Sequence, residues 1–360
     1  MKHTIIVHSM NMNNMKPFLE YYKKNNLSKK VKLRVIESSD SNKIISKLQK
    51  IFYMYFKKYD GIISDYPTKL LEKKNKVSIA MGHGTAMKKF PSDKELENKN
   101  ALQLSQSVKQ ADYYITTSDR QNDLEFRNPV LEKHSNNKYL SLGLPKNDYY
   151  FDVKKVNEIY LQERKNNGFS SDSFIVVYAP TWRDYTTEKQ YFNEKILTSL
   201  NKLLSDKDAF MIYRPHPLGG TIDEDLLESL NLDRILISKN YNLDTYSTLC
   251  IADALISDYS SICIEYLPLN RPIISLIFDE DEYNKHRGLE FNFRDENISP
   301  GVVVTEIDKI TETLQKLFNN EFNNEKWIKR RKRCLSSHYT FPDGNASERI
   351  WRLILNELSQ

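Results

Sequence analysis

The sequence predicts an α/β protein made of two Rossmann-type units, each with a mostly parallel sheet covered by helices. Short apolar runs alternate with polar, helix-forming stretches along most of the chain, as is typical of parallel sheets. The alternation restarts near residue 173, and 360 residues exceed the length of one compact core of usual size. Two nucleotide-binding-type domains in series predict a ligand cleft between them.

Apolar runs of strand length mark the elements of both units. In the first unit we expect strands at 4–9, 32–38, 59–66, 76–82, 111–118 and 138–145. In the second unit we expect strands at 173–182, 209–217, 234–239, 252–260 and 271–279. Lysine-rich helical stretches such as residues 42–58 lie between them. Ligands of open parallel sheets bind beyond the carboxyl ends of the strands, so residues directly after these runs are the site candidates.

The boundary between the units is expected in the charged stretch 151–173, which ends in glycine and serine. This placement gives an N-terminal Rossmann-like domain at 1–165 and a C-terminal Rossmann-like domain at 166–345. A C-terminal helix at 346–360 is expected to pack back on the N-terminal domain.

Composition narrows the class of protein. The net charge of +5, from 53 cations and 48 anions, suits an anionic partner without demanding one. Cys250, Cys263 and Cys334 form no CxxC pair and no metal-ligand spacing, which favours reduced thiols and a cytosolic chain. No stretch reaches the roughly 18 apolar residues of a membrane-spanning helix, and the N-terminal apolar run is too short for a signal peptide. We therefore expect an intracellular protein, either soluble or held at a membrane from the cytoplasmic side.

One candidate site follows a strand of the second unit, in "MIYRPHP". Arg214 and His216 come directly after the strand, and Pro215 and Pro217 fix the backbone around the histidine. A guanidinium beside an imidazole can clamp an anion. A rigid turn with a surface histidine is the plainer interpretation, but the position after a strand favours a ligand site.

A second candidate is "ISDYSSICIEYL", where a strand ends at Asp258 and a helix is expected to begin near Ser260 and Ser261. Serine hydroxyls and backbone N–H groups at a helix start bind anions. The plainer interpretation is a serine N-cap with Glu265 inside the first turns, and both can hold together. The GxGxxG and GxxxxGK[ST] fingerprints are absent, so phosphate binding would depend on serines.

A third candidate is "YAPTWRD", at the end of the first strand of the second unit. Thr181, Trp182 and Arg183 combine a hydroxyl, a planar ring and a cation, a set that can line a pocket for a nucleotide or a phosphate. Trp182 is equally compatible with a core position, because tryptophan is usually well buried.

The first unit carries "MGHGTAMKKF" after its fourth strand. Glycines on both sides of His83 let the backbone approach a ligand closely, and histidine is the commonest general base near neutral pH. Alone, such a histidine is more often structural; facing an anion site across a cleft, it is a candidate to deprotonate an acceptor hydroxyl. Thr85 is expected to cap a helix, with two lysines one turn along it. The acceptor-side candidates are Gly84, Thr85, Lys88 and Lys89.

Five consecutive cations occupy residues 329–333, in "WIKRRKRCL". Most such runs are solvated helix faces, and the alternative is a contact with anionic lipid headgroups. No nucleic-acid-binding motif accompanies the run, so nucleic acid is not an expected partner.

Taken together and in order, "GHGTAMKK", "YAPTWR", "YRPHP", "ISDYSSICIEYLPLNRPII" and "DGNASERI" resemble the CDP-glycerol glycerophosphotransferase family, whose members build teichoic acids and related capsules in bacteria. The resemblance implies a GT-B-like fold, with two Rossmann-type domains facing a central cleft, and CDP-glycerol or CDP-ribitol as the donor. It also implies an acceptor, a polyol phosphate or a saccharide, carried on a polyprenyl diphosphate lipid. The enzyme would then sit peripherally on the inner face of the bacterial cell membrane.

The resemblance also implies roles for single residues. It places a catalytic base toward the acceptor on His83 and a second catalytic histidine, near the donor diphosphate, on His216. The implied reaction is attack by an alcohol on the β-phosphorus of the donor, with release of CMP. The donor-side candidates are Thr181, Trp182, Arg183, Arg214, Asp258, Ser260, Ser261 and Glu265.

Several alternatives stay open from the sequence. No carboxylate cluster marks a metal site, so no metal ligand is assigned and a role for Mg²⁺ is left open. A GT-B transferase or epimerase that uses a UDP-sugar is the alternative enzyme. A catalytically idle scaffold is the alternative of another class, against which the presence of His83 and His216 argues. The chain starts at its first strand, so we expect it to lack any additional N-terminal region of longer family members, which leaves primase, polymerase and capsule roles open.

Overall fold

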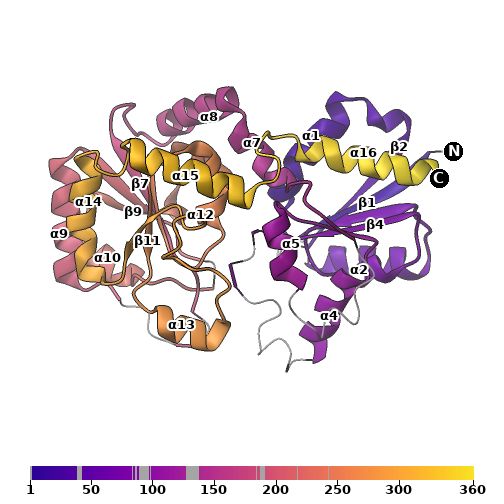
Figure 1. The fold of residues 1–360 in the computed structure, drawn as a ribbon, viewed down its shortest axis with the longest axis horizontal. Helices are drawn as coiled ribbons and strands as arrows, with labels where there is room; N and C mark the ends of the chain where they lie inside the picture. The colour runs from indigo at the N-terminus through magenta and orange to yellow at the C-terminus, as the bar shows by residue number, and fades with distance from the viewer. Residues whose placement is uncertain are drawn as a thin grey trace. The chain divides into compact units, whose positions relative to one another are not determined.

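In a computed structural model, the chain forms two compact units (Figure 1). The first comprises Met1–Phe151 together with Ser337–Gln360, and the second comprises Asp152–Ser336. The structure describes residues 2–38, 43–82, 84–85, 87–88, 97, 99–126, 138–183, 185–186, 191–216, 218–241 and 243–360.

In the first unit the described strands form a six-stranded sheet in which every neighbouring pair is parallel. The strands are β1 (His3–Ser9), β2 (Val31–Glu37), β3 (Gly61–Ser64), β4 (Val77–Met81), β5 (Tyr113–Ile115) and β6 (Lys138–Leu140). The helices include α1 (Lys16–Lys24), α2 (Lys43–Tyr55), α4 (Lys99–Lys109), α5 (Asp119–Phe126), α7 (Asp148–Phe151) and α16 (Ala346–Ser359). The strand order β2-β1-β3-β4-β5-β6 reverses direction between β1 and β3, which makes that pair the topological switch point of the sheet.

The second unit also has a six-stranded parallel sheet within its described residues. The strands are β7 (Phe174–Ala179), β8 (Ala209–Tyr213), β9 (Ile235–Ile237), β10 (Ala254–Ser257), β11 (Ile273–Leu276) and β12 (Val302–Val304). The helices include α8 (Val153–Asn166), α9 (Glu194–Asp206), α10 (Glu224–Ser229), α11 (Thr245–Ile251), α12 (Ile262–Glu265), α13 (Glu280–Arg287), α14 (Ile310–Phe318) and α15 (Glu325–His338). The order β12-β11-β10-β7-β8-β9 is that of a dinucleotide-binding Rossmann sheet, with its switch point between β7 and β10.

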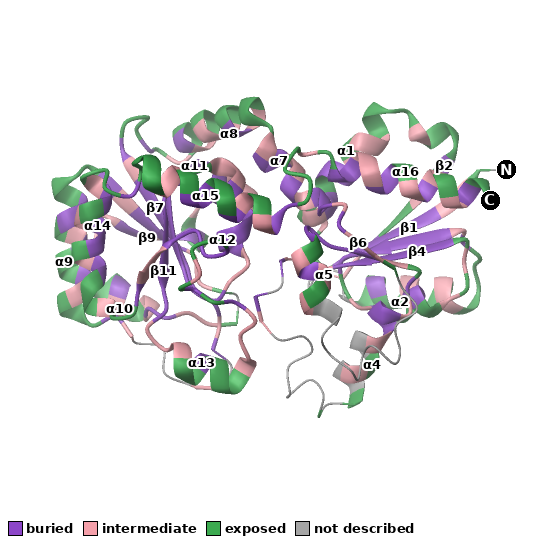
Figure 2. Ribbon diagram, in the orientation of Figure 1, coloured by how far each residue is buried: buried purple, intermediate pink, exposed green. Residues whose placement is uncertain are grey.

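The central strands of both sheets are buried along their whole length. This holds for β3 and β4 in the first unit and for β10 and β11 in the second. A parallel sheet with helices on both faces needs strands that are apolar on both sides, which explains the continuous apolar runs of the sequence. Figure 2 shows the central strands buried and the outward faces of the helices exposed.

The predicted α/β fold with two parallel sheets is confirmed, and each of the eleven strands expected from the apolar runs is present. The twelfth strand, β12, was not predicted, because only three valines of a short run pair with β11 at the edge of the sheet. We expected the domain boundary at residue 165, whereas the division into compact units follows Phe151 and assigns α8 to the second unit.

The C-terminal helix α16 packs against the first unit. The ring of Trp351 stacks on Phe18 of α1, with 4.5 Å between ring centroids, and its Nε1–H donates to the Phe18 carbonyl oxygen at 3.0 Å. The carboxylate of Asp148 accepts the backbone N–H groups of Ala346 and Ser347 at 2.9 Å each, which caps the start of the helix. Among the described residues, no helix has the length and apolar character that a membrane crossing requires.

Candidate functional site

The carboxyl edge of the second sheet gathers the donor-side candidates. Residues 181–183 follow β7, Arg214 and His216 follow β8, and residues 258–261 follow β10. These three strands are neighbours in the sheet, and β7 and β10 flank the switch point, where open α/β sheets bind ligands. The fold therefore brings three motifs that are far apart in the sequence to one edge.

A buried ion-pair network ties three strand ends together at this edge. Arg183, which is 5% exposed, donates from Nη1 to Asp258 Oδ2 at 2.5 Å. Its Nε and Nη2 donate to the two carboxylate oxygens of Asp279, after β11, at 3.0 and 2.9 Å. The other oxygen of Asp258 accepts the backbone N–H of Thr181 at 2.8 Å. Arg183 and Asp258 are thus paired with each other, and their ion pair holds the ends of β7 and β10 together.

Two tyrosines also donate hydrogen bonds to the carboxylate of Asp279. Tyr185 donates to Oδ2 at 3.0 Å and Tyr259 donates to Oδ1 at 2.9 Å. Burial is the largest cause that raises the pKa of both phenols, so they remain protonated donors. Burial on its own would raise the pKa of Asp279, but the hydrogen bonds and charge of Arg183 outweigh it and lower that pKa below its usual value.

Asp279 and Tyr259 were not singled out from the sequence, although both carried a signal. Asp279 is the last residue of the expected strand 271–279, and Tyr259 lies inside the "ISDYSS" motif. Both thus lay at the carboxyl ends of expected strands, and in the structure both follow the shorter strands β10 and β11.

The rings of Trp182 and His216 lie at the accessible part of the edge. Their planes are nearly parallel, at 12°, with 6.1 Å between centroids. Trp182 is half-buried and His216 is exposed, so the tryptophan is not a core residue. The chain turns back after His216, whose carbonyl oxygen accepts the N–H of Gly219 at 2.9 Å. A Cβ on Gly219 would lie 3.0 Å from the indole, so glycine permits this close packing.

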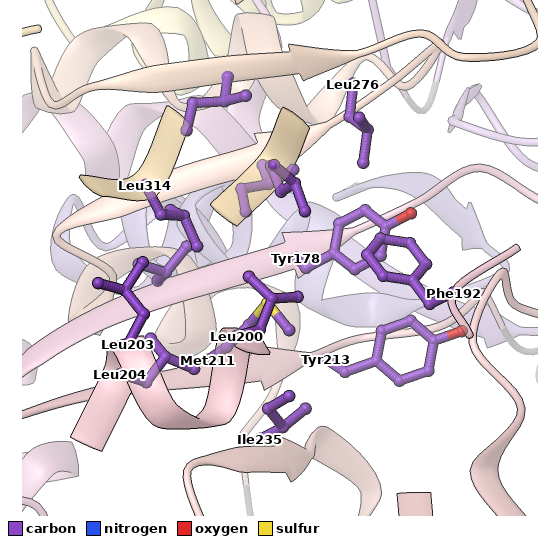
Figure 3. Packing of buried hydrophobic residues seen from close by; sticks show 14 of the residues in the cluster. Tyr178, Phe192, Leu200, Leu203, Leu204, Met211, Tyr213, Ile235, Leu276 and Leu314 are labelled. Carbon is purple, nitrogen blue, oxygen red and sulfur yellow. The ribbon is translucent and has the colours of Figure 1, made fainter. Parts of the chain in front are cut away.

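Two core tyrosines support the turn that carries His216. The hydroxyl of Tyr213 accepts the backbone N–H of Thr221 at 2.8 Å, and the hydroxyl of Tyr178 lies 2.7 Å from Thr221 Oγ1. The two rings come from neighbouring strands and lie together at one end of the apolar cluster (Figure 3). A Cβ on Gly220 would lie 1.8 Å from the Tyr213 hydroxyl oxygen, so only glycine fits there. These contacts therefore fix the turn after His216 against the apolar core.

The hydrogen bonds of the RPHP motif set its chemistry. The backbone N–H of Leu218 donates to His216 Nδ1 at 3.2 Å. A ring nitrogen that accepts a hydrogen bond carries no proton, so this geometry assigns the proton of the neutral ring to Nε2. Arg214 is half-buried, and its Nη2 donates to Thr245 Oγ1 at 2.7 Å, at the start of α11. The motif thus offers an N–H donor and a guanidinium on the same edge.

Ser260 and Ser261, here called the serine pair, are half-buried after β10. The Oγ of Ser260 accepts the N–H of Ile262 at 3.4 Å, and the Oγ of Ser261 donates to Oε1 of the buried Glu265 at 3.0 Å. The helix expected near the serines is α12, which has only four residues. A dipole sums over aligned peptide units, so this helix contributes little to anion binding, and the hydroxyls matter more.

The first-unit motif is described in part. Two of its candidates, His83 and Lys89, lie outside the described residues. Thr85 is buried with its hydroxyl 3.5 Å from that of Thr117, and Gln121 Nε2 donates to the Gly84 carbonyl oxygen at 3.4 Å. The expectation that Thr85 caps a helix is wrong, because Met87 and Lys88, which would lie in the first turn of that helix, are not helical. The hydroxyl of Thr85 instead packs against the residues that follow β5.

A buried polar cluster at the switch point of the first sheet was not predicted. His8 Nδ1 lies 2.7 Å from Ser64 Oγ and its Nε2 lies 3.0 Å from Ser38 Oγ. Ser9 Oγ donates to Asp65 Oδ2 at 2.8 Å. Burial lowers the pKa of His8 to about 4, so the ring is neutral at neutral pH. The available signal was the tetrapeptide ISDY, which occurs at the ends of both β3 and β10.

Comparison with known proteins identifies the family. The model of the CDP-Glycerol:Poly(glycerophosphate) glycerophosphotransferase family matches residues 4–356. The chain belongs to this family. A teichoic acid poly(glycerol phosphate) polymerase of Staphylococcus epidermidis is 29% identical over 265 residues, which cover 70% of this chain and 35% of that protein. A polymerase of the same description from Bacillus spizizenii is 28% identical over 298 residues, 76% of this chain and 69% of that protein.

A third relative matches over a shorter region. The teichoic acid glycerol-phosphate primase of Bacillus subtilis is 28% identical over 232 residues, 62% of this chain and 52% of that protein. The chain thus spans between about a third and about two thirds of the length of these relatives. The family resemblance expected from the ordered motifs is confirmed.

Solved structures establish the fold of this glycerophosphotransferase family member. A structure of the wall teichoic acid polymerase TagF matches with a TM-score of 0.74 at 24% identity, covering 99% of this chain and 89% of that one. A UDP-GlcNAc 2-epimerase from Neisseria meningitidis matches with a TM-score of 0.61 at 12% identity, covering 99% and 100%. Both likenesses support two Rossmann-type domains of the GT-B kind. Within the described residues, no group of three or more His, Cys, Asp or Glu side chains is placed to hold a metal ion.

Proposed function

We propose that this family member transfers a polyol phosphate from a CDP-polyol to a hydroxyl group of a teichoic acid or capsule acceptor and releases CMP. The polyol is glycerol or ribitol. The observation that carries the proposal is the family match over residues 4–356, which includes every candidate motif. The named relatives are teichoic acid polymerases and a primase, which is consistent with it.

The donor is proposed to bind over the carboxyl edge of the second sheet. The half-buried indole of Trp182 offers a face for stacking, and Nε2–H of His216 and the guanidinium of Arg214 are donors for the diphosphate. The serine pair adds hydroxyl groups after β10. The buried Oγ1 of Thr181 has no hydrogen-bond partner among the described residues, so a bound donor would supply one.

The buried charged residues of the edge are proposed to position these groups. Arg183 and Asp258 join the ends of β7 and β10, and Asp279 joins them to β11. Glu265 accepts from Ser261 and so orients one hydroxyl of the serine pair. In this proposal, these four residues act through their neighbours and do not contact the donor.

The chemistry follows from the donor's structure. The acceptor oxygen attacks the β-phosphorus and forms a new P–O bond, while the bond from this phosphorus to the oxygen that bridges the two phosphates breaks. CMP leaves with the bridging oxygen, and the acceptor proton passes to the proposed base, His83. Arg214 and His216 stabilise the negative charge that develops on the leaving CMP oxygen.

The acceptor side is proposed to lie on the first unit, where the remaining candidates are Gly84, Thr85, Lys88 and Lys89. We further propose that the acceptor is carried on a lipid and that the enzyme works as a peripheral protein at the inner face of the bacterial cell membrane. A polymer built on a lipid carrier requires its enzyme to reach the membrane surface.

Product analysis tests the proposed reaction. The full chain is incubated with CDP-glycerol or CDP-ribitol and a lipid-linked polyol-phosphate acceptor, and the nucleotide product is identified by chromatography. We expect CMP, in an amount that depends on the acceptor. A GT-B glycosyltransferase attacks an anomeric carbon and releases a nucleoside diphosphate. Release of CDP, or turnover only with a UDP-sugar, would overturn the proposal in favour of that alternative.

A further inference from the structure

The carboxyl edge of the first sheet has its own switch point, between β1 and β3, to which the proposed reaction assigns no residue. The loops that follow these two strands begin at Met10 and Asp65. Open parallel sheets bind ligands in the crevice where such loops diverge. The acceptor candidates named above follow β4 instead. The switch point is therefore the place in the first unit where a further ligand contact is expected.

Asp65 is the centre of a group of polar side chains at this switch point. It is 3% exposed, and its Oδ2 accepts the hydroxyl of Ser9 at 2.8 Å and the side-chain amide of Asn14 at 2.9 Å. The backbone N–H of Asn11 donates to Ser9 Oγ at 3.1 Å. A carboxylate, a hydroxyl and an amide together offer the acceptors and donors with which a hydroxyl-bearing ligand can pair.

The tetrapeptide ISDY ends both β3 and β10, but its two aspartates have different partners. Asp258 pairs with the guanidinium of Arg183. The donors at Asp65 Oδ2 are neutral, a hydroxyl and a side-chain amide. Cations suit a diphosphate, whereas a carboxylate held by neutral donors repels phosphate and accepts hydrogen bonds from hydroxyl groups. The first edge therefore suits the hydroxyl part of a substrate, and the second edge suits its phosphates.

The residues below the switch point fix the loop after β3. Ser64 Oγ donates to the Tyr66 carbonyl oxygen at 2.6 Å and accepts the Tyr66 backbone N–H at 3.2 Å. A hydroxyl has a single proton, so the contact of 2.7 Å between Ser64 Oγ and His8 Nδ1 is donated by the histidine. These bonds hold the backbone of Tyr66, whose side chain is 36% exposed at the mouth of the group.

A buried amide beside these loops also indicates a bound hydroxyl compound. Asn147 is 2% exposed, and neither its Oδ1 nor its Nδ2 has a hydrogen-bond partner among the described residues. It ends η5 (Pro145–Asn147), which packs against η1 (Met12–Met15), the turn that contains Asn14. Buried polar atoms are nearly always hydrogen-bonded, so each exception calls for a partner. A hydroxyl group both donates and accepts, and it can therefore pair with either atom of the amide.

We propose that the switch-point site, formed by Ser9, Asn14, Asp65, Tyr66 and Asn147, binds the hydroxyl groups of the polyol unit that ends the acceptor. Asp65 accepts a hydrogen bond from a hydroxyl of this unit, and the exposed ring of Tyr66 packs on its carbon atoms. The inference rests on the proposed function, in which a hydroxyl of a teichoic acid or capsule acceptor is the nucleophile.

Saturation-transfer difference NMR on the full chain tests the class of ligand. The probes are glycerol 3-phosphate, ribitol 5-phosphate and propyl phosphate, which has the phosphate but no hydroxyl groups on its carbon chain. CDP is present throughout to occupy the donor edge. The parent chain should bind at least one polyol phosphate more than about tenfold more tightly than propyl phosphate, because the analogue leaves buried polar groups unpaired. Equal affinities for all the probes would overturn the proposal.

Variants of the site test the residues. Asp65→Asn removes the charge without a change of shape and should weaken polyol phosphate binding more than about tenfold. The matched control is Asp112→Asn at the opposite edge of the same sheet, where Asp112 Oδ2 accepts the hydroxyl of Ser78 at 2.8 Å, and its binding should equal that of the parent. Tyr66→Ser removes an exposed ring, so the fold is kept, and should weaken binding at least about threefold. Parent-like binding by either folded variant would overturn the proposal.

Asn147→Leu separates a ligand contact from a structural role. Leucine is of similar size and removes two unpaired buried polar atoms, so the melting temperature of the first unit without ligand should rise by about 2–4 °C. Polyol phosphate affinity should fall at least about threefold in the same variant, because the ligand loses a hydrogen-bond partner. Unchanged affinity would overturn the assignment of Asn147 to the site.

Kinetics distinguish the failure of this inference from the failure of the proposed function. With a polyol-phosphate acceptor, Asp65→Asn should raise the KM for the acceptor more than about tenfold and leave CDP affinity unchanged. If the parent released CMP and this KM were unchanged, the switch-point site would be overturned and the proposed function would stand. Absence of CMP release from the parent would refute the proposed function, and the NMR affinities would still decide whether the site binds a polyol.

Discussion

Replacement of Arg183 by methionine should strongly destabilise the second unit. Methionine retains an unbranched apolar stem but leaves Asp258 and Asp279 without their cation. Asp258 is 1% exposed, so water cannot replace the lost partner. Removal of one member of a buried ion pair costs about 3–5 kcal/mol, because the remaining charge is buried and unpaired. We therefore expect the free energy of unfolding of the second unit to fall by about 3–5 kcal/mol, and donor affinity to fall with it.

Two controls separate the buried charge from side-chain size. Adding Asp258→Asn and Asp279→Asn to Arg183→Met removes all three charges, so much of the lost stability should return. Arg234 pairs with Asp208, whose side chain is 67% exposed, at 3.2 Å. Surface ion pairs contribute about 0–1 kcal/mol, so Arg234→Met should have a small effect.

Hydrogen exchange followed by mass spectrometry suits this measurement. Peptides from β7 and β10 report opening of the second unit separately from the first, whose peptides serve as an internal reference. The reasoning would be refuted if Arg183→Met lowered the opening free energy of these strands by less than about 1 kcal/mol, as expected for Arg234→Met.

Further predictions concern the candidate site and the buried histidine of the first sheet. His83→Ala should lower the rate of CMP release by about 10²–10⁴-fold with CDP affinity nearly unchanged, and near-normal turnover would contradict its role as a base. His216→Ala should lower turnover and weaken donor binding together, as measured by kinetics and calorimetry; a purely catalytic defect would contradict the assigned donor contact. Ser260→Ala/Ser261→Ala should weaken CDP binding more than about tenfold, and unchanged affinity would exclude the serine pair. The pKa of His8 is about 4 in the fold against an ordinary 6.5, so its contribution to stability is complete above pH 6.5 and is lost as the pH falls toward 4. His8→Gln should therefore remove about 3 kcal/mol of pH dependence from urea unfolding across this range, and an unaltered pH dependence would disprove the assignment.

The fold could be predicted because parallel strands that are buried on both faces leave continuous apolar runs in the sequence. The runs at β3, β4, β10 and β11 are of this kind, and each of these strands is wholly buried. The exception, β12, lies at a sheet edge and pairs over three residues, so its run is too short to distinguish a strand from a loop.

The candidate site could be predicted as a set of positions but not as a set of roles. Trp182 and Arg183 are consecutive, yet the indole is half-exposed while the guanidinium is buried between two carboxylates. Those carboxylates, Asp258 and Asp279, lie 75 and 96 residues further along the chain. A role that depends on distant partners cannot be inferred from neighbouring residues, whereas a position after a strand can.

The role of a run of charged residues likewise depends on contacts with residues that are distant in the sequence. Arg330 and Arg331 belong to a conspicuous basic run and are bound by carbonyl oxygens, whereas the scattered lysines of α2 flank an exposed apolar face. The proposed acceptor side belongs to the first unit and the proposed donor edge to the second, and the chain divides into these two compact units. Arg183→Met should therefore lower CDP affinity and the protection of peptides from β7 and β10, while peptides from β3 and β4 of the first unit keep the protection of the parent chain. Equal loss of protection in both units would mean that they do not open as separate compact units.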